Sequence, residues 1–536
     1  MRKISIALSL LLLVATSVIA QNVNIYWGKL NNEDRSASTT LIGKRGGFLF
    51  AVKESGRNTS ILKYGMNDLQ VTAENTIMGK LPKGMTGKTI SSDYNFHSIL
   101  PMKQSMYITV TGYDRKIKEN SLYIQPIDDG GRLTGSLSKL ESIDAKSKYN
   151  RGSFQVIMSD DSTKFLLVDA PPYDKYAGEK YTFSIYDGNL SQLKKLQVEL
   201  PFKDKSFDLN DITFSNDGNI YMMAKILIDR KEKVKGEATY YYELISVNTA
   251  GDGSVTEYEI KLPGKFIDGI SFSPDEDKDI VCAGLYGDMT GTAKGDISGV
   301  FFMRLNKTSK QVDATGMKAL DKDFIADLTS ERKANKGKGI SNDFKLKNFI
   351  RRSDGGSILL AEYSYDYVVT YTTTDSHGMT TTRTDYHYVR NNIIAININP
   401  DGSIKWTADI PKYQHTVNDG GKYLSYALAT KGDKIFIVYN EASENMDPQR
   451  IKDGKKPRVM GSPQNSTAVM VELSEDGQFD KKALFNSKDN KVALLPEHYL
   501  KISENEVIIP AYNGGVQCCI ISFKSATSKL ARFEFK

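Results

Sequence analysis

The sequence predicts an all-β fold, a β-propeller built from four-stranded antiparallel blades. A strand–turn–strand unit closed by an Asp, Asn or Gly turn returns about eight times along the chain. The copies recur at a long, roughly constant period, which is typical of repeat architectures. Because the repeated elements are strands separated by turn residues, the period indicates propeller blades rather than a helical solenoid.

The clearest blade is expected between about 210 and 263. Its four strands, A to D, are expected at 212–215, 220–227, 240–247 and 255–262. Asn216-Asp217-Gly218 forms the A–B turn, and Gly251-Asp252-Gly253 forms the C–D turn. Asn-Gly and Asp-Gly pairs suit tight hairpins because they accept positive φ at little cost.

The same pattern predicts seven further blades. They are expected at about 39–75, 94–142, 153–200, 267–319, 346–411, 424–486 and 499–536. Seven blades in total are the alternative, if an end blade consists of two half-blades joined by the strand Val23–Trp27. The charged segment near 321–340 is expected to be a short helical or loop insertion. A two-domain alternative would divide the chain there, but the strand pattern is the same on both sides, which favours one propeller domain over 21–536.

Residues 1–20 are expected to be a secretory signal peptide. Arg2 and Lys3 precede an apolar run that ends before Ala20, a small residue suited to cleavage. A membrane anchor is the alternative, disfavoured because the run is short and contains Ser and Thr. No later segment approaches the roughly 20 apolar residues of a membrane span. We therefore expect an exported protein, periplasmic, cell-surface or extracellular, without a membrane span after cleavage.

Charge and cysteine content narrow the function classes. The formal net charge of +6 is too small to indicate nucleic-acid binding. A chain of this length buries enough surface to fold without disulfides. The three cysteines, Cys282, Cys518 and Cys519, lie in or beside apolar runs and are expected to be buried structural thiols.

Two turn sequences resemble those of a known group of propellers. Phe214-Ser215-Asn216-Asp217-Gly218 and Phe272-Ser273-Pro274-Asp275 are similar to the repeats of TolB-like and WD-type propellers. The resemblance covers most of the chain as a repeat style and implies the fold without a particular activity. Eight-bladed quinone dehydrogenases carry a tryptophan in nearly every blade. Here only Trp27 and Trp406 occur, which disfavours that family.

The loops predict which face of the propeller carries function. In this architecture the A–B and C–D turns lie on one face and the B–C loops on the other. The turns are short and uniform, whereas long B–C insertions are expected near 228–240, 361–398 and 441–467. Variable loops on a rigid scaffold are where binding usually resides. We therefore predict a site on the B–C face or in the central channel.

The insertion at 361–398 is rich in tyrosine. Its candidate ligand-binding residues are Tyr363, Tyr365, Tyr367 and Tyr371 on the outgoing strand, with Tyr386 and Tyr388 on the return strand. Residues two apart share one face of a strand, so these side chains are expected to form one aromatic stripe. Such a stripe can stack on sugar rings or pack against a protein, although cross-strand aromatic pairs also simply stabilise a hairpin.

The insertion at 441–467 is basic. Lys455, Lys456 and Arg458 are candidate binding residues, which together with the basic stretch at 230–235 could form a rim that attracts an acidic glycan or a lipid headgroup. The plain alternative is that these are solvated loop tips.

Catalytic signals are weak, because no nucleophile elbow, phosphate loop or zinc motif occurs and the five histidines are scattered. We predict no catalytic residue, no metal and no cofactor. The leading hypothesis is an exported non-catalytic propeller that binds a glycan or an envelope protein through its B–C loops. One alternative is a carbohydrate-active enzyme, a polysaccharide lyase or hydrolase, with its site in the channel. The other is a scaffold subunit of a cell-envelope complex.

Overall fold

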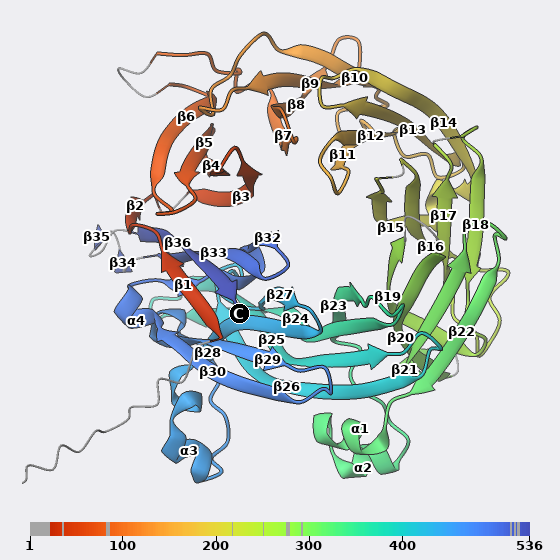
Figure 1. The fold of residues 1–536 in the computed structure, drawn as a ribbon, viewed down its shortest axis with the longest axis vertical. Coiled ribbons are helices and arrows are strands. Elements are labelled where there is room, and N and C mark those ends of the chain that lie inside the picture. The colour runs from red at the N-terminus through yellow and green to blue at the C-terminus, as the bar shows by residue number, and fades with distance from the viewer. Residues whose placement is uncertain are drawn as a thin grey trace, which may run out of the picture.

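The computed structural model describes most of the chain as a ring of β-sheets around a central axis (Figure 1). The described residues are 22–34, 37–81, 86–216, 218–249, 251–274, 279–290, 293–514, 517–518, 521–522 and 526–536. The predicted signal peptide, residues 1–20, lies outside them. Within the described residues, seven four-stranded sheets and one larger closing sheet follow one another around the ring. The predicted all-β fold and its eight blades are therefore confirmed.

The first four blades each consist of four consecutive antiparallel strands. Blade 1 contains β3 (Ser38–Arg45), β4 (Phe48–Ser55), β5 (Asn58–Gly65) and β6 (Val71–Met78). Blade 2 contains β7 (Asn95–Pro101), β8 (Met106–Asp114), β9 (Glu119–Ile127) and β10 (Ser138–Asp144). Blade 3 contains β11 (Ser153–Met158), β12 (Lys164–Ala170), β13 (Gly178–Asp187) and β14 (Gln192–Lys203). Blade 4 contains β15 (Phe207–Phe214), β16 (Ile220–Leu227), β17 (Tyr240–Val247) and β18 (Val255–Ile260).

Blades 5 to 7 repeat the arrangement with longer strands. Blade 5 contains β19 (Lys265–Pro274), β20 (Asp279–Thr290), β21 (Ala293–Asn306) and β22 (Val312–Ala319). Blade 6 contains β23 (Phe344–Arg351), β24 (Ser357–Thr374), β25 (Thr380–Ile398) and β26 (Ile404–Val417). Blade 7 contains β27 (Ala427–Lys431), β28 (Lys434–Ala442), β29 (Ser466–Leu473) and β30 (Phe479–Asn486).

Blade 8 is assembled from both ends of the chain. Its sheet contains β31 (Ala493–Leu494), β32 (Leu500–Ser503), β33 (Glu506–Asn513), β36 (Ala526–Phe535), β1 (Val23–Trp27) and β2 (Asn31–Glu33). The first strand of the chain, β1, pairs antiparallel with the last, β36, from Val23↔Phe535 to Trp27↔Ala531. The strand that the seven-blade alternative assigned to a split blade thus provides the fourth strand of an eighth blade. A separate short ribbon joins β34 (Gln517–Cys518) to β35 (Ile521–Ser522).

Two short helices follow blade 5, within the segment 321–340. They are α1 (Lys322–Leu328) and α2 (Glu331–Asn335). The side chain of Asp321 accepts a hydrogen bond from the N–H of Asp323, and Ser330 caps α2 in the same way. Phe324 and Ile325 are buried against the core between blades 5 and 6, which fixes the insertion to the ring. The other short helices are α3 (Pro448–Lys452), α4 (Ser487–Asn490) and the 3₁₀ turns η1 (Asp204–Ser206), η2 (Ser443–Met446), η3 (Pro463–Asn465) and η4 (Pro496–His498).

The core lies between neighbouring blades, so both faces of each central strand are covered. In β24, Leu359 and Ala361 pack toward blade 5, whereas Ile358 and Leu360 pack toward blade 7. This is why central strands read as continuous apolar runs, since a strand covered on both faces shows no polar alternation. The free thiol of Cys282 is fully buried in β20, and burial raises its pKa, as expected of a structural cysteine.

The C–D turn of blade 6 shows why the turn residues recur. The N–H of Gly402 donates to the carbonyl of Asn399 at 2.9 Å, and φ of Gly402 is +83°. A Cβ at Gly402 would also lie 2.8 Å from the Cα of Gly316 in blade 5. The turn thus requires glycine for its conformation and for contact with the next blade.

A buried carboxyl in blade 4 makes stability depend on pH. Glu243 is only 5% exposed and pairs across the sheet with Glu259. Burial, and then repulsion from Glu257 and Glu259, raises the pKa of Glu243 from 4.5 to about 8. Because the unfolded chain releases this proton at lower pH than the folded protein does, stability falls as pH rises from about 4.5 to about 8.

We expect Glu243→Gln to raise the free energy of unfolding by about 2 kcal/mol at pH 8.5, where the native carboxyl must ionise. The gain should nearly vanish at pH 4, where the carboxyl is protonated in both states. Urea denaturation at the two pH values measures the difference. Glu54→Gln, at an exposed position of blade 1, is the control. An equal gain at both pH values would contradict the explanation.

Candidate functional site

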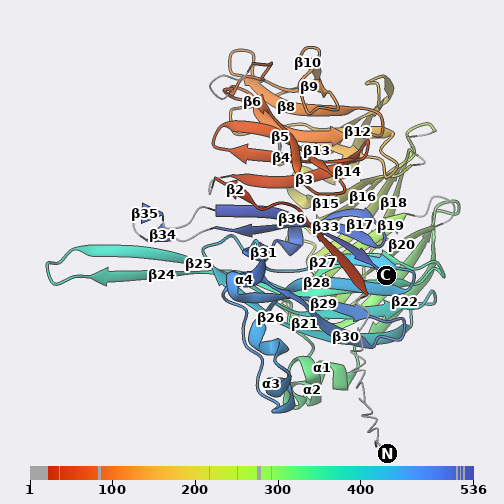
Figure 2. The same cartoon turned by 60° about the vertical axis from the view of Figure 1, so that its left-hand side comes forward.

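The most distinctive feature of the B–C face is a long hairpin that projects from blade 6. Strands β24 and β25 extend well past the edge of the ring (Figure 2). They pair continuously from Ser364↔Arg390 to Thr374↔Thr380, and the turn at the tip is closed by a hydrogen bond from the N–H of Gly378 to the carbonyl of Asp375. We call residues 364–390 the arm.

Aromatic side chains stack along one face of the arm. The rings of Tyr363 and Tyr365 meet edge to face at 5.6 Å, and those of Tyr365 and Tyr367 stack at 5.9 Å. Tyr367 in turn lies nearly parallel to the ring of His387, with centroids 4.5 Å apart and an interplanar angle of 5°. The series ends at His415 on β26, 5.2 Å from His387. We call these five side chains the aromatic ladder.

Two histidines complete the ladder by a direct hydrogen bond. Nδ1 of His387 lies 2.9 Å from Nε2 of His415, so one ring donates a proton to the other. Burial, and then the neighbouring His387, lowers the pKa of His415. The bond joins β25 to β26 where the third strand ends and the arm continues as two strands. It therefore stabilises the root of the arm.

The predicted stripe is correct for the outgoing strand and wrong for the return strand. Tyr386 lies opposite Val368 and Tyr388 opposite Asp366, so both point to the other face of the arm. Tyr386 is 51% exposed there, whereas Tyr388 packs against Leu424 and Met460. The register decides this, because Tyr367 pairs with His387, and a one-residue offset exchanges the faces of a strand.

Tyr371 lies farther along the ladder face, opposite Arg383, and is 50% exposed. Sequence reasoning missed His387 and His415 as members of the ladder because it treated the histidines as scattered. A signal for their register was present. The threonine triplets at 372–374 and 380–382 are symmetric about His377, and a hairpin centred there pairs Tyr367 with His387.

The root of the arm is held by a fully buried ion pair. Nζ of Lys412 on β26 lies 2.7 Å from Oε1 of Glu362 on β24, and both side chains are inaccessible to solvent. Lys412 also donates to the side chain of Gln414 and to the carbonyl of Arg390, while Ser425 donates to Oε2 of Glu362 at 2.9 Å. Burial lowers the pKa of Lys412. This network ties blade 6 to the start of blade 7.

The predicted basic residues lie on the loop that contains α3. Lys455 forms an ion pair with Asp453 at 3.0 Å, and Lys456 and Arg458 are exposed. The basic stretch at 230–235 belongs to blade 4, whereas this loop belongs to blade 7. Blades 5 and 6 lie between them, so the two loops do not form one continuous rim (Figure 1). A cavity of 230 Å³ beneath the loop is lined by Tyr413, Glu441, Arg450, Lys455 and Lys481, among others.

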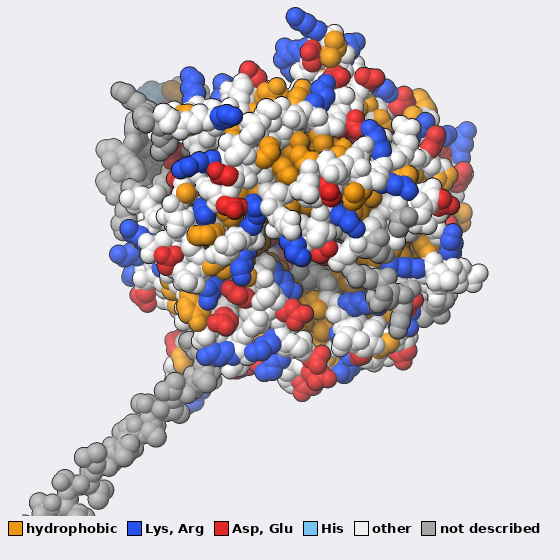
Figure 3. Space-filling model, turned by 45° about the horizontal axis from the view of Figure 1, so that its top comes forward, with side chains coloured by type: hydrophobic (Ala, Val, Ile, Leu, Met, Phe, Trp, Pro, Cys, Tyr) orange, Lys and Arg blue, Asp and Glu red, His pale blue; other side chains and the backbone are white. Residues whose placement is uncertain are grey.

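Two cavities lie on the opposite, turn face. One, of 810 Å³, opens at the axis and is lined by A–B turns of several blades, including Asp160, Arg352, Asp433 and Glu504. The enzyme hypothesis would place a substrate here. Arg352 donates to the side chain of Asn397 and forms an ion pair with Asp354. Positive and negative side chains are interspersed over this face in the oblique view (Figure 3).

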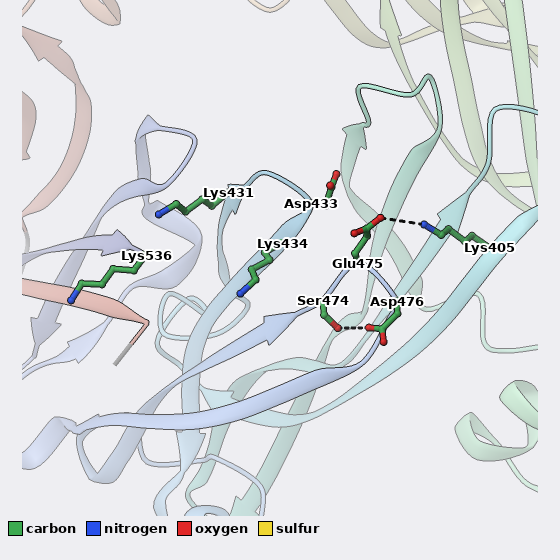
Figure 4. Close-up of a pocket in the computed structure, with 8 residues that line it drawn as sticks. All are labelled: Lys405, Lys431, Asp433, Lys434, Ser474, Glu475, Asp476 and Lys536. Atoms are coloured by element: carbon green, nitrogen blue, oxygen red, sulfur yellow. Dashed lines mark hydrogen bonds and ion pairs between the residues drawn. The ribbon is translucent and has the colours of Figure 1, made fainter. Parts of the chain in front are cut away.

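The other cavity, of 730 Å³, lies beside the turns of blade 7 (Figure 4). Its lining residues are Lys405, Lys431, Asp433, Lys434, Ser474, Glu475, Asp476 and Lys536. Lys405 lies 3.7 Å from Glu475, and Ser474 donates to Asp476. The first contact joins blade 6 to the turn of blade 7 and the second lies within that turn, so part of the polar lining holds the turns in place.

Within the part of the chain that the structure describes, no three His, Cys, Asp or Glu side chains gather as metal ligands would. Among the same residues, no helix has the length and apolar character needed to cross a bilayer.

Comparisons with known proteins bear on the fold alone. No family model and no curated protein matches the chain. The uncharacterized protein lmo1340 from Listeria monocytogenes is 9% identical, with 81% of this chain and 95% of that chain covered and a TM-score of 0.35. The β-propeller domain of the Trilobed protease from Pyrococcus furiosus is 10% identical, with 70% and 97% covered and a TM-score of 0.31. Prolyl oligopeptidase B from Galerina marginata is 8% identical, with 89% and 55% covered and a TM-score of 0.38.

Proposed function

We propose that this protein is an exported, non-catalytic β-propeller that binds another protein through the arm. The observation that carries the proposal is the stacking of the rings in the aromatic ladder. Tyr367 is stacked on His387 on one side and faces Tyr365 on the other, with interplanar angles of 5° and 22°. The faces of these rings are therefore directed at one another, and Tyr367 is closely stacked on His387.

Stacked rings favour a protein partner over a glycan. A sugar binds an aromatic side chain by lying flat on a free ring face, and within the ladder the faces of Tyr365 and Tyr367 are directed at neighbouring rings. The two side chains are nevertheless 37% and 39% exposed, so part of each ring is open to a partner. Tyrosines that combine an apolar body with a polar tip are enriched in protein–protein interfaces.

The exposure of the arm supports the same proposal. Val368 is 56% exposed, Met379 66% and Tyr371 50%, on a two-stranded ribbon that projects from the ring. An isolated two-stranded hairpin is at best marginally stable in water. Apolar side chains gathered on such an element indicate a surface that a partner covers. With the signal peptide predicted for residues 1–20, we propose that this partner lies in the cell envelope or outside the cell.

Site-specific photo-cross-linking tests the proposal. With a benzoylphenylalanine in place of Tyr371, we expect one discrete cross-linked protein in cells of the source organism. Replacing Tyr365 and Tyr367 with Ala should reduce its yield about tenfold, because central aromatic residues dominate interface energies. The same cross-linker at Ile117, 65% exposed on blade 2, is the control and should give no discrete product.

A glycan array run on wild type and on the double alanine variant separates the two ligand classes. Tyrosine-dependent binding to a defined oligosaccharide, without a cross-linked protein, would overturn the proposal in favour of a glycan. A cross-linked protein together with an array unchanged by the substitutions would support it.

A further inference from the structure

The arm has one edge whose backbone is unpaired. Strand β23 pairs with β24 only as far as Phe344↔Tyr363, and the N–H of Ser364 then donates to the carbonyl of Asp343 at 2.8 Å. From Tyr365 to Thr374, the backbone of β24 pairs only with β25 among the described residues. Backbone groups alternate in direction along a strand. The outward N–H and C=O groups are therefore those of Asp366, Val368, Thr370, Thr372 and Thr374.

This edge lacks the features that usually prevent strand addition. Between Ser364 and Thr374 there is no Lys, Pro or Gly, and most residues are β-branched or aromatic. The single charge, on Asp366, is already neutralised by Arg390, whose Nη1 lies 2.6 Å from its carboxylate. An open, uncharged strand edge of this length is a template for another strand.

The β25 edge of the arm carries groups that hinder the addition of a strand, which favours the β24 edge as the one that pairs. Asn418 exchanges two hydrogen bonds with the backbone of Tyr386 on β25, at 2.8 and 2.9 Å. Farther along β25, Arg383 and Asp385 form an ion pair. Charged side chains and backbone covers of this kind are how proteins block strand addition.

We propose that the β24 edge pairs antiparallel with the β24 edge of a second copy of this chain, centred on Val369. The inference rests on the proposed function and names the partner of the same arm. The sequence is self-complementary in this register, because Val369 lies opposite Val369 and Tyr367 lies opposite Tyr371 of the partner subunit. Asp366 faces a threonine, so no like charges meet.

The pairing follows the rules for a two-fold interface. The same surface serves both copies, as in the commonest type of homodimer. The outward groups of Val368 meet those of Thr370 in the other copy, and each arm extends the other into a four-stranded sheet. The aromatic ladder of one copy then continues across the axis into that of the second. The arm, which as an isolated two-stranded hairpin is only marginally stable, becomes part of a four-stranded sheet.

A cysteine at the centre tests the register directly. Val369 would face itself in a non-hydrogen-bonded pair, where Cα atoms lie roughly 4.5 Å apart, within the range that disulfides span. Under mild oxidation we expect full-length Val369→Cys to form a covalent dimer in more than about half of the molecules. Val368→Cys, which points to the other face and lies opposite Thr370, is the matched control and should form about tenfold less. Wild type gives the background from the native cysteines.

A second variant tests the pairing without a cross-link. Thr370→Pro removes an N–H that points away from β25, so the arm itself should fold unchanged, as proline is accepted on strand edges. We expect the mass of two chains for wild type by light scattering and of one chain for Thr370→Pro. A monomeric wild type, or equal cross-linking from positions 368 and 369, would overturn the inference.

The two proposals fail in different ways. If wild type is monomeric but the cross-linker at Tyr371 captures a different protein, the dimer is wrong and the protein-binding function stands. If neither a second copy nor another protein is found at the arm, both fail.

Discussion

Lys412→Met is expected to lower the free energy of unfolding by about 3–5 kcal/mol, because it leaves the carboxylate of Glu362 buried without its cation. Both side chains are fully buried and lie 2.7 Å apart at the root of the arm. The remaining hydrogen bond from Ser425 and the more distant Lys347 do not replace a direct ion pair. Glu362→Met should lower the free energy of unfolding by a similar amount, since it leaves the ammonium group of Lys412 buried without its carboxylate.

The double variant Glu362→Met/Lys412→Met separates the pair from simple loss of packing. Replacing both charges with apolar side chains removes the desolvation cost together with the attraction, so we expect the double variant to be more stable than either single variant. Guanidinium denaturation of wild type, the two single variants and the double variant gives the coupling energy between the two side chains. Lys455→Met removes the exposed pair with Asp453 and should change stability by less than about 1 kcal/mol. Additive single effects would show that the pair is not coupled.

Asn24→Pro is expected to open the ring at blade 8. The N–H of Lys536 donates to the carbonyl of Asn22, and that of Gly28 donates to the carbonyl of Leu530. Alternation therefore directs the N–H of Asn24 toward β36, where proline would remove a ladder hydrogen bond and clash with the neighbouring strand. We expect a loss of about 1–3 kcal/mol, the cost of leaving a backbone carbonyl of β36 without its donor.

Hydrogen exchange locates that effect. In the proline variant, amides of β36 and β33 should exchange much faster, whereas those of blades 3 to 5 across the ring should change little. Asn24→Ala keeps the N–H and is the control for loss of the side chain. If the alanine and proline variants exchange alike, the backbone bond is not what closes the ring.

Regular repetition is what made the fold predictable. In blade 4 the expected strands at 220–227 and 240–247 coincide with β16 and β17, because tight turns and apolar runs bound them. The first strand begins at Phe207 rather than at 212, since a bulge between Leu209 and Asp211 breaks the alternation that sequence reasoning relies on.

The parts of the site that depend on strand pairing were harder to predict from the sequence. The four tyrosines of β24 share a face because spacing within one strand is local. The faces of Tyr386 and Tyr388 depend on register, and a bulge at Asn391 and Asn392 shifts β25 by one residue between its root and the arm. The cavities of the turn face gather turns from blades far apart in the chain, a convergence that no local pattern records.

The joining of β1 to β36 has a consequence for how the protein is made. Among the described residues β1 pairs only with β36, a strand of ten residues, so β1 has no partner in the fold until β36 has been made. Blades 1 to 7 can form one after another while β1 remains unpaired. Closure of the ring therefore cannot precede the synthesis of β36, more than 490 residues after β1.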